Sequence, residues 1–344
     1  MPQPSVLWYT RCPVPTTSGI AQHYRWLHDE FARAGIALES IRASTDKSVR
    51  VSHFDHSHPN MFREGGNVPP IWARGLGRDT AVVGITWVDE EQLILVRGDS
   101  DIRTLAQLGG RKLGLPKHAG QIVDVGRTQD LRGLLTALQI GGIHRDQVDF
   151  VDLDGEAFDL REHRDERPHL GAEALLSGTV DAIYAKGAVG ATLVETHGFR
   201  PILDINAEAD PLLRIGSGTP RPITVDATLA RDYPEVVARY LAVLQQTSAW
   251  AKTHPQEVGA AIAAETGALE AAVRRGFGEQ LHQHFDVSLS ELSVTALRRQ
   301  HAFLVAEGFA QDFDFDAWIN PEPLRLASEI QVAFPAIEPK AVAA

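Results

Sequence analysis

The stretch QLILVRGDSDIRTLAQLGGRKLGLP, residues 92–116, changes its pattern three times within a short span. The apolar run at 92–96 is typical of a buried strand, and the acidic and serine residues at 99–101 are suited to cap a following helix. The pair Gly109-Gly110 ends that helix, and the apolar residues after it return to a strand pattern. A strand, a helix and another strand in this order predict a parallel sheet with helices on its faces.

The same alternation continues on both sides of this stretch. Residues 24–34 carry apolar side chains at helical spacing, and Gly35 ends that predicted helix. After residue 230 the pattern becomes mainly helical to about residue 310. The other predicted strands are apolar runs that cover residues 6–10, 36–43, 80–86, 148–153, 180–185 and 201–205. The sequence therefore predicts an α/β protein with helices in its last third.

Composition limits the partners that this chain can have. It contains 344 residues with a net charge of −12, enough for two domains, and an acidic chain is a poor partner for nucleic acid. Its single cysteine cannot form an internal disulfide. We find neither a secretory signal nor an apolar run long enough for a membrane span, so we expect a cytoplasmic protein without membrane contact. The oligomeric state is not readable from these patterns, and a monomer is compatible with them.

Two stretches point to one fold family. DIRTLAQLGGRKLGLP, residues 101–116, and SGTVDAIYAKGAVGATLVETHG, residues 177–198, resemble segments of the type II periplasmic-binding-protein fold. That resemblance implies two α/β lobes around a ligand cleft. Lobe one would comprise residues 1–97 and 211–344, with the C-terminal helices packed on it, and lobe two residues 98–210. The fold alone leaves function open, because transport receptors, regulators and enzymes share it.

Two further stretches carry the residues most suited to chemistry. YTRCPVP, residues 9–15, holds the only cysteine, and VSHFDHSHPNMFREGGNVPPIW, residues 51–72, has no clear period and reads as a loop or a broken element. Each feature also has an ordinary explanation. A lone cysteine is usually a small buried side chain, histidines and an arginine can be solvated, and Gly-Gly can be a turn. The spacing of His53, His56 and His58 could instead hold a transition metal, although no fourth ligand is evident.

Together these two stretches resemble the aryl sulfinate desulfinase family. The family pattern is Cys-Pro-Val-Pro near the N-terminus, then His-Phe, then Arg-x-Gly-Gly-x-x-Pro-Pro, and each part is present here. QHAFLVAEGF (300–309) and DAWINPE (316–322) extend the likeness towards the C-terminus. The resemblance implies a catalytic Cys12, an active-site His53, a sulfinate-binding Arg63 and a Gly66 whose N–H holds sulfinate oxygens. It implies no cofactor and no metal.

The chemistry of these residue types agrees with such roles. A sulfinate is a compact anion with two acceptor oxygens, which suits the planar fork of Arg63. The glycines Gly65 and Gly66 let the backbone approach those oxygens without a Cβ in the way. Cys12 could protonate the carbon that carries sulfur, or its thiolate could attack the sulfur. The sequence leaves both mechanisms open.

The remaining expectations concern the substrate. Relative to the family, Arg11, His56 and His58 replace Asn, Tyr and Gln, and Gln129 lies near the position of a pocket tryptophan. We therefore expect a smaller or more polar sulfinate than hydroxybiphenyl sulfinate. The further predicted substrate-binding residues are Phe54, His56, His58 and Arg11.

The alternative function is a binding protein of a sulfonate, nitrate or taurine transporter, or a sensor, that lacks catalysis. A single cysteine argues against the Cys-rich thiamin-pyrimidine synthases of the same fold.

Overall fold

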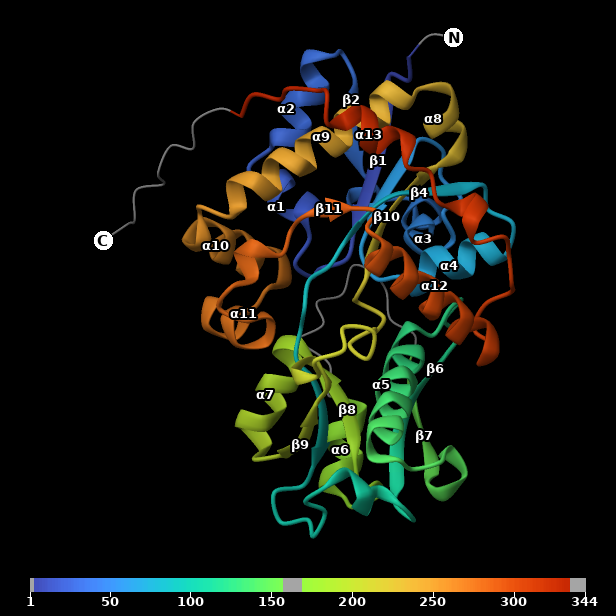
Figure 1. Ribbon diagram of the computed structural model, residues 1–344, viewed down its shortest axis with the longest axis vertical. Helices are drawn as coiled ribbons and strands as arrows, with labels where there is room; N and C mark the ends of the chain where they lie inside the picture. Colours follow the sequence, from blue (N-terminus) through green and yellow to red (C-terminus); the bar gives the residue numbers. More distant parts are fainter. Residues whose placement is uncertain (1–2, 157–168, 335–344) are drawn as a thin grey trace.

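The computed structural model describes residues 3–156 and 169–334, which form two groups of elements along the longest axis of the molecule (Figure 1). The larger group contains both ends of the described chain and a six-stranded sheet. The smaller group contains the middle of the sequence and two smaller sheets. We call these groups the large lobe and the small lobe.

The large sheet is mixed rather than purely parallel. β1, β2 and β3 pair in parallel, while β10 is antiparallel to both β3 and β4. It follows that β1, β3 and β4 run in one direction and end at the same edge of the sheet. In spatial order the strands are β11 (Val287–Ser288), β4 (Thr80–Thr86), β10 (Arg221–Asp226), β3 (Met61–Glu64), β1 (Val6–Arg11) and β2 (Ala37–Ser40).

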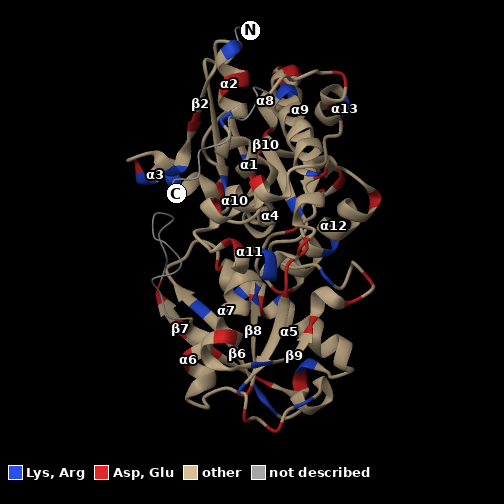
Figure 2. Ribbon diagram, turned by 90° about the vertical axis from the view of Figure 1, so that its left-hand side faces the viewer, with Lys and Arg blue, Asp and Glu red and all other residues tan. Residues whose placement is uncertain are grey.

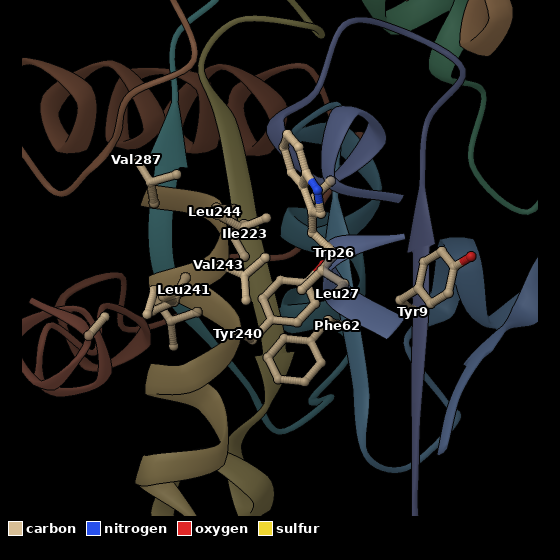
Figure 3. Close-up of a cluster of buried hydrophobic side chains, with 14 of the residues drawn as sticks. Tyr9, Trp26, Leu27, Phe62, Ile223, Tyr240, Leu241, Val243, Leu244 and Val287 are labelled. Atoms are coloured by element: carbon tan, nitrogen blue, oxygen red, sulfur yellow. The ribbon is translucent and has the colours of Figure 1, made fainter. Parts of the chain in front are cut away.

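One face of this sheet is covered by a long apolar core. Phe62 of β3 stacks on Tyr240 with ring centroids 4.0 Å apart, and Leu241, Leu244 and Ile223 pack around them (Figure 3). Full burial of one apolar side chain of this size stabilises the fold by about 1.5–3 kcal/mol. The helices of this core are α1 (Thr17–His23), α2 (Trp26–Arg33), α8 (Ala227–Asp232), α9 (Pro234–Ala251), α10 (Pro255–Thr266), α11 (Glu270–Phe277) and α13 (Glu322–Ala327).

The opposite face carries a second core and, with it, most of the predicted site residues. Phe54, Val68 and Ile71 pack there against Val82 and against the last long helix. The helices concerned are α3 (Lys47–Asp55), α4 (Val68–Gly75) and α12 (Glu291–Ala306). The stretch at 51–72, predicted as a loop or broken element, thus supplies the end of α3, the central strand β3 and the start of α4.

The small lobe is built on two sheets. β5 (Gln92–Val96) lies between β8 (Ile183–Lys186) and β9 (Arg200–Asp204), and both pairings are antiparallel. β6 (Lys112–Ala119) pairs in parallel with β7 (Asp149–Glu156). The helices of this lobe are α5 (Val125–Gly141), α6 (Leu170–Leu176) and α7 (Gly187–His197). Since β5 pairs here, the chain leaves the large sheet after β4.

Several predicted elements differ from those observed. The helix expected at 24–34 begins at Trp26, because Arg25 adopts a left-handed conformation with φ 64° and separates α2 from α1. The helix expected after 99–101 is only a 3₁₀ turn at Leu105–Leu108, capped by Thr104. The predicted parallel pairing is also wrong for β5, which is antiparallel to β8 and β9, because strand direction depends on long connections that periodicity does not reveal. β10 and β11, which are antiparallel to their neighbours too, lie outside the predicted strands.

Charged residues of both signs occur along the whole length of the molecule (Figure 2). Within the described ranges, no helix combines the length and the apolar composition that crossing a membrane requires. The large sheet is covered by helices on both faces. Its edge where β1, β3 and β4 end lies towards the small lobe. That edge positions the site.

Candidate functional site

The fold brings the two chemically distinctive stretches to this edge. Cys12 follows the last residue of β1, and Gly65 follows the last residue of the neighbouring β3. The carboxyl ends of parallel strands in α/β folds are where ligands commonly bind, since loops there are free to carry polar groups. The chain leaves the end of β4 to form the small lobe, so this edge lies between the lobes (Figure 1).

Cys12 is partly exposed and is held by the backbone of β3. Its N–H donates to Glu64 O at 3.2 Å, and its own carbonyl accepts from the Val14 N–H at 2.8 Å. A Cβ on Gly65, which has φ 154°, would lie only 2.5 Å from Cys12 Sγ. Glycine at this position is therefore what allows the sulfur to lie against the backbone of β3.

His53 approaches the same sulfur from α3. Its Nε2 lies 3.8 Å from Cys12 Sγ, and its Nδ1 shares a 2.8 Å hydrogen bond with Thr10 Oγ1 on β1. Burial, assisted by the positive charge of Arg63, lowers the pKa of His53 well below its ordinary value. The ring is therefore neutral at neutral pH and has one nitrogen directed at the sulfur.

Arg63 completes the group, although its side chain is fully buried. Nε donates to His53 O at 3.0 Å, Nη1 to Gly66 O at 2.8 Å, and Nη2 to Cys12 Sγ at 3.6 Å. Burial lowers the pKa of Arg63, and the neighbouring Cys12 opposes that shift. A guanidinium has five N–H groups, so one on Nη1 and one on Nη2 are left by the contacts within the described residues. Two N–H groups of a guanidinium that point the same way can grip a pair of oxygens.

A loop before β10 forms the floor beneath the glycines. The N–H of Asn67 donates to Ser217 O at 2.9 Å, and a Cβ on Gly66 would lie 2.7 Å from that same carbonyl. Ser217 Oγ donates to Gln129 Oε1 of α5 at 2.9 Å, which joins the loop to the small lobe. Gln129 in turn donates to Asp130 at 3.4 Å, and burial raises the pKa of Asp130 to about 8.

Two of the residues predicted to bind substrate lie behind the site. Phe54 belongs to the apolar core under α4 and meets the His53 ring edge-on at 5.0 Å. His56 is buried, with Nε2 3.1 Å from Thr224 Oγ1, and burial lowers its pKa well below the ordinary value. Phe54 thus supports the His53 ring, and His56 contacts Thr224, the β10 residue that pairs with Arg63. Neither contacts Cys12 in the described structure.

Two others do not join the group. Arg11 points to the opposite face of the sheet, where Nη2 pairs with Glu265 at 2.6 Å. His58 packs edge-on against Trp8, with ring centroids 4.6 Å apart. Trp8 precedes Cys12 by four positions on β1, which at about 3.3 Å per residue is roughly 13 Å. Side chains alternate between the two faces along β1, which explains why Arg11 lies on the opposite face from Thr10. The left-handed turn at His56 (φ 51°) directs the chain away from Cys12 before it reaches His58.

The sequence prediction missed three neighbours of the site. Thr10 precedes Arg11 on the strand, and alternation along the strand places its side chain on the face of His53. Ser217 and Arg221 carry no local motif, and only the antiparallel insertion of β10 beside β3 brings them to this edge. In residues 3–156 and 169–334, no three His, Cys, Asp or Glu side chains gather as metal ligands.

Fold and site together define a two-lobed α/β protein of the type II periplasmic-binding-protein class with a cysteine between its lobes. A periplasmic sulfonate-binding protein, SsuA of Methylobacillus flagellatus, superposes with a TM-score of 0.71 over 96% of this chain and 95% of its own, at 17% identity. At that identity the likeness shows the fold alone. No family model matches the chain.

More specific relatives are desulfinases. The chain is 28% identical over 350 residues to 2'-hydroxybiphenyl-2-sulfinate desulfinase of Rhodococcus erythropolis, with 92% of each chain covered. The crystal structure of the desulfurization enzyme DszB superposes with a TM-score of 0.73 at 27% identity, over 94% of this chain and 99% of that one. A cysteine-to-serine variant of DszB in complex with biphenyl-2-sulfinic acid gives 0.72 at 26% identity, with the same coverage. The resemblance predicted from the sequence is thus confirmed over nearly the whole chain.

Proposed function

We propose that this protein is a sulfinate desulfinase that cleaves a carbon–sulfur bond and releases sulfite without a cofactor. The single observation that carries the proposal is the convergence of His53 Nε2 and Arg63 Nη2 on Cys12 Sγ, at 3.8 and 3.6 Å. A pure binding protein has no need of a thiol at that point. The scaffold is also similar to that of a desulfinase whose variant was crystallised with biphenyl-2-sulfinic acid.

The overall reaction consumes one water: R–SO₂⁻ and H₂O give R–H and HSO₃⁻. Arg63 would hold the two sulfinate oxygens through its remaining Nη1 and Nη2 hydrogens, with the Gly66 N–H as a further donor. Two backbone carbonyls already hold the guanidinium in place before an anion binds. Cys12 Sγ would then lie beside the sulfur-bearing carbon.

Two routes fit this geometry. In the first, the Cys12 thiol protonates the carbon, and the electron pair of the C–S bond stays with that carbon as neutral SO₂ leaves. Hydration of SO₂ to bisulfite then releases the proton that restores the thiol. In the second, neutral His53 takes the thiol proton, the thiolate forms an S–S bond to the sulfinate sulfur, and the carbon leaves with a proton. Water then cleaves the Cys12–SO₂⁻ adduct to thiol and bisulfite.

The two routes differ in what accumulates on the only cysteine of the chain. The second route predicts an SO₂ adduct on Cys12 in intact-mass spectra of acid-quenched reactions. The first predicts no adduct and a slower reaction in deuterated water, since a proton moves to carbon in the bond-breaking step. Either result identifies the role of the thiol.

The decisive test of the function is sulfite release from a panel of aromatic and alkyl sulfinates. We expect Cys12→Ser to reduce the rate by about 10²–10⁴-fold, the usual range for a proton-transferring group. A sulfinate or sulfonate that binds tightly to the wild type without turnover would replace this proposal with a binding function. Release that survives Cys12→Ser unchanged would remove Cys12 from the mechanism.

Gln129, which lies beside the proposed sulfinate site, favours a polar substrate. Gln129 is fixed between Ser217 Oγ and Asp130, one hydrogen bond from the loop that contacts Gly66. An amide at this place favours a substrate with a polar substituent over an extended aromatic one. We expect kcat/KM for a hydroxylated or small alkyl sulfinate to exceed that for biphenyl-2-sulfinate, and the same panel of substrates decides this.

A further inference from the structure

Arg221 is a fully buried arginine at the edge where the site lies, and no sequence motif marks it. It begins β10, two positions before Ile223, which pairs with Glu64 of β3. Since β10 is antiparallel to β3, Arg221 comes level with Gly66, just past the end of β3. The register therefore places Arg221 near Cys12, in addition to Arg11 and Arg63, and on the α1 side of the sheet.

Its first contact is with the segment that carries the thiol. Arg221 Nη1 donates to Pro15 O at 2.5 Å. Pro15 ends the Cys12-Pro-Val-Pro segment, whose two prolines restrict φ and leave few backbone N–H groups to anchor it. At its other end the segment is tied to β3 through the Cys12 N–H and Glu64 O. Arg221 thus supplies the second anchor.

Its second contact leads to the small lobe. Arg221 Nη2 lies 3.9 Å from Glu90 Oε2, and Glu90 Oε1 accepts a 2.6 Å hydrogen bond from Lys186 Nζ. Glu90 belongs to the connection from β4 to β5, and Lys186 is the last residue of β8. A chain of charged groups thus runs from a strand of the small lobe to the thiol segment.

This chain lies under the floor of the site as well. A Cβ on Gly218 would come within 2.4 Å of Glu90 Oε1 and 2.6 Å of Lys186 Nζ, so the loop before β10 packs directly on that ion pair. The neighbouring Ser217 carbonyl supports Gly66. Burial lowers the pKa of Arg221, while Glu90, Glu64 and Cys12 oppose the shift. A buried charge is costly unless it has a partner, and here the partners include the thiol's own segment.

We propose that Arg221 is a positioning residue for Cys12: it fixes the Cys12–Pro15 segment against the Glu90–Lys186 pair and so ties the direction of the thiol to the arrangement of the lobes. It acts through the backbone of that segment rather than by binding the sulfinate. The kinetic part of this inference rests on the proposed function. The structural part does not.

The kinetic test compares Arg221→Gln and Arg221→Lys with the wild type. A displaced thiol slows the chemical step while the Arg63 fork still binds the anion, so we expect Arg221→Gln to lower kcat about tenfold or more with KM within about threefold. Arg221→Lys, which retains a charged donor, should recover part of the loss. Glu90→Gln, which leaves Arg221 in place, should lower kcat in the same direction by a smaller factor. A rise in KM at constant kcat would overturn the proposal and make Arg221 a substrate-binding group.

A second readout does not depend on activity. We expect the amides of Cys12 and Val14 to exchange with deuterated water at least about tenfold faster in Arg221→Gln, because the segment has lost an anchor. Arg214→Gln is the matched control, since Arg214 also lies in the chain that returns from the small lobe and pairs with Asp89 at 3.1 Å, without contact to the thiol segment. Unchanged exchange in Arg221→Gln would overturn the proposal. If the wild type releases no sulfite, the proposed function fails, yet this exchange experiment still decides the role of Arg221.

Discussion

At the scale of single residues, the site depends on a contact that only glycine permits. Gly65 combines φ 154° with a Cβ position 2.5 Å from Cys12 Sγ. Gly65→Ala must therefore move the sulfur away from His53 and Arg63. We expect sulfite release to fall about 100-fold, the loss typical of a reacting atom displaced by about 1 Å. Steady-state kinetics with a good sulfinate substrate measures this.

Gly77→Ala is the control that distinguishes the clash with the Cys12 sulfur from backbone strain. Gly77 also has a positive φ, 84°, but open space surrounds its Cβ position. Both variants should lose about 1–2 kcal/mol in the free energy of unfolding, since an L side chain is strained at such φ values. Only Gly65→Ala should lose activity. Equal losses of activity in the two variants would mean that strain, not the sulfur contact, matters at Gly65.

Arg63 offers a second test at this scale. Arg63→Lys keeps the positive charge but cannot donate to His53 O, Gly66 O and Cys12 Sγ in one plane. We expect kcat/KM for sulfite release to fall about 10²–10³-fold, as for the loss of a preorganised oxyanion donor. The matched control is Arg50→Lys, because Arg50 is also buried and donates to two backbone carbonyls, of Ser44 and Thr45. Activity retained in Arg63→Lys would show that charge alone suffices.

At the scale of elements, α5 carries a buried acid whose titration should be visible in stability. Burial raises the pKa of Asp130 to about 8, so the folded chain keeps a proton that the unfolded chain loses near pH 4. Stability then falls as pH rises towards 8, by about 1.4 kcal/mol per unit, and this loss levels off above that value. Asp130→Asn, which keeps an acceptor for Gln129, removes the dependence.

Between pH 6 and pH 8 the wild type should therefore lose about 2 kcal/mol in the free energy of unfolding relative to Asp130→Asn. Urea unfolding at both pH values measures it. Asp99→Asn, at a strongly exposed carboxylate, is the control and should show no such growth. A constant difference between Asp130→Asn and the wild type would mean that Asp130 is ionised at both pH values.

Elements also explain what could be predicted from the sequence. The strand at 80–86 matches β4 because an unbroken apolar run is buried on both faces. The Cys12, His53 and Arg63 group was predicted by a motif, and alternation along β1 could have added Thr10. Ser217 and Arg221 could not be predicted, because their proximity depends on β10 entering the sheet between β3 and β4. Arg11 follows the local alternation along β1, which places its side chain on the face of Glu265 rather than that of the thiol.

At the scale of the whole molecule, α12 joins the two lobes on one side. The guanidinium of Arg132 on α5 lies 4.9 Å from the centroid of the Phe303 ring on α12, and Phe303 contacts apolar cores of both lobes. Arg145 and Glu307 form a 2.9 Å ion pair nearby. Together with Gln129 and Ser217, these contacts couple the small lobe to the large one.

This coupling predicts how the molecule unfolds. All six tryptophans lie before residue 97 or after residue 210, so tryptophan fluorescence follows the large lobe, whereas far-ultraviolet circular dichroism follows both lobes. In the wild type the two signals should report one transition in urea. Phe303→Ala removes the shared apolar contact, at a cost of about 2–3 kcal/mol for a partly buried ring, and should separate the two midpoints because the small lobe then unfolds first. Leu292→Ala changes an exposed side chain of the same helix and should leave the midpoints together. If the two transitions still coincide in Phe303→Ala, the lobes are coupled by the chain segments that connect them, which contain Glu90 and Arg214. The direction of the thiol would then depend on Glu90 and Lys186 and not on α12.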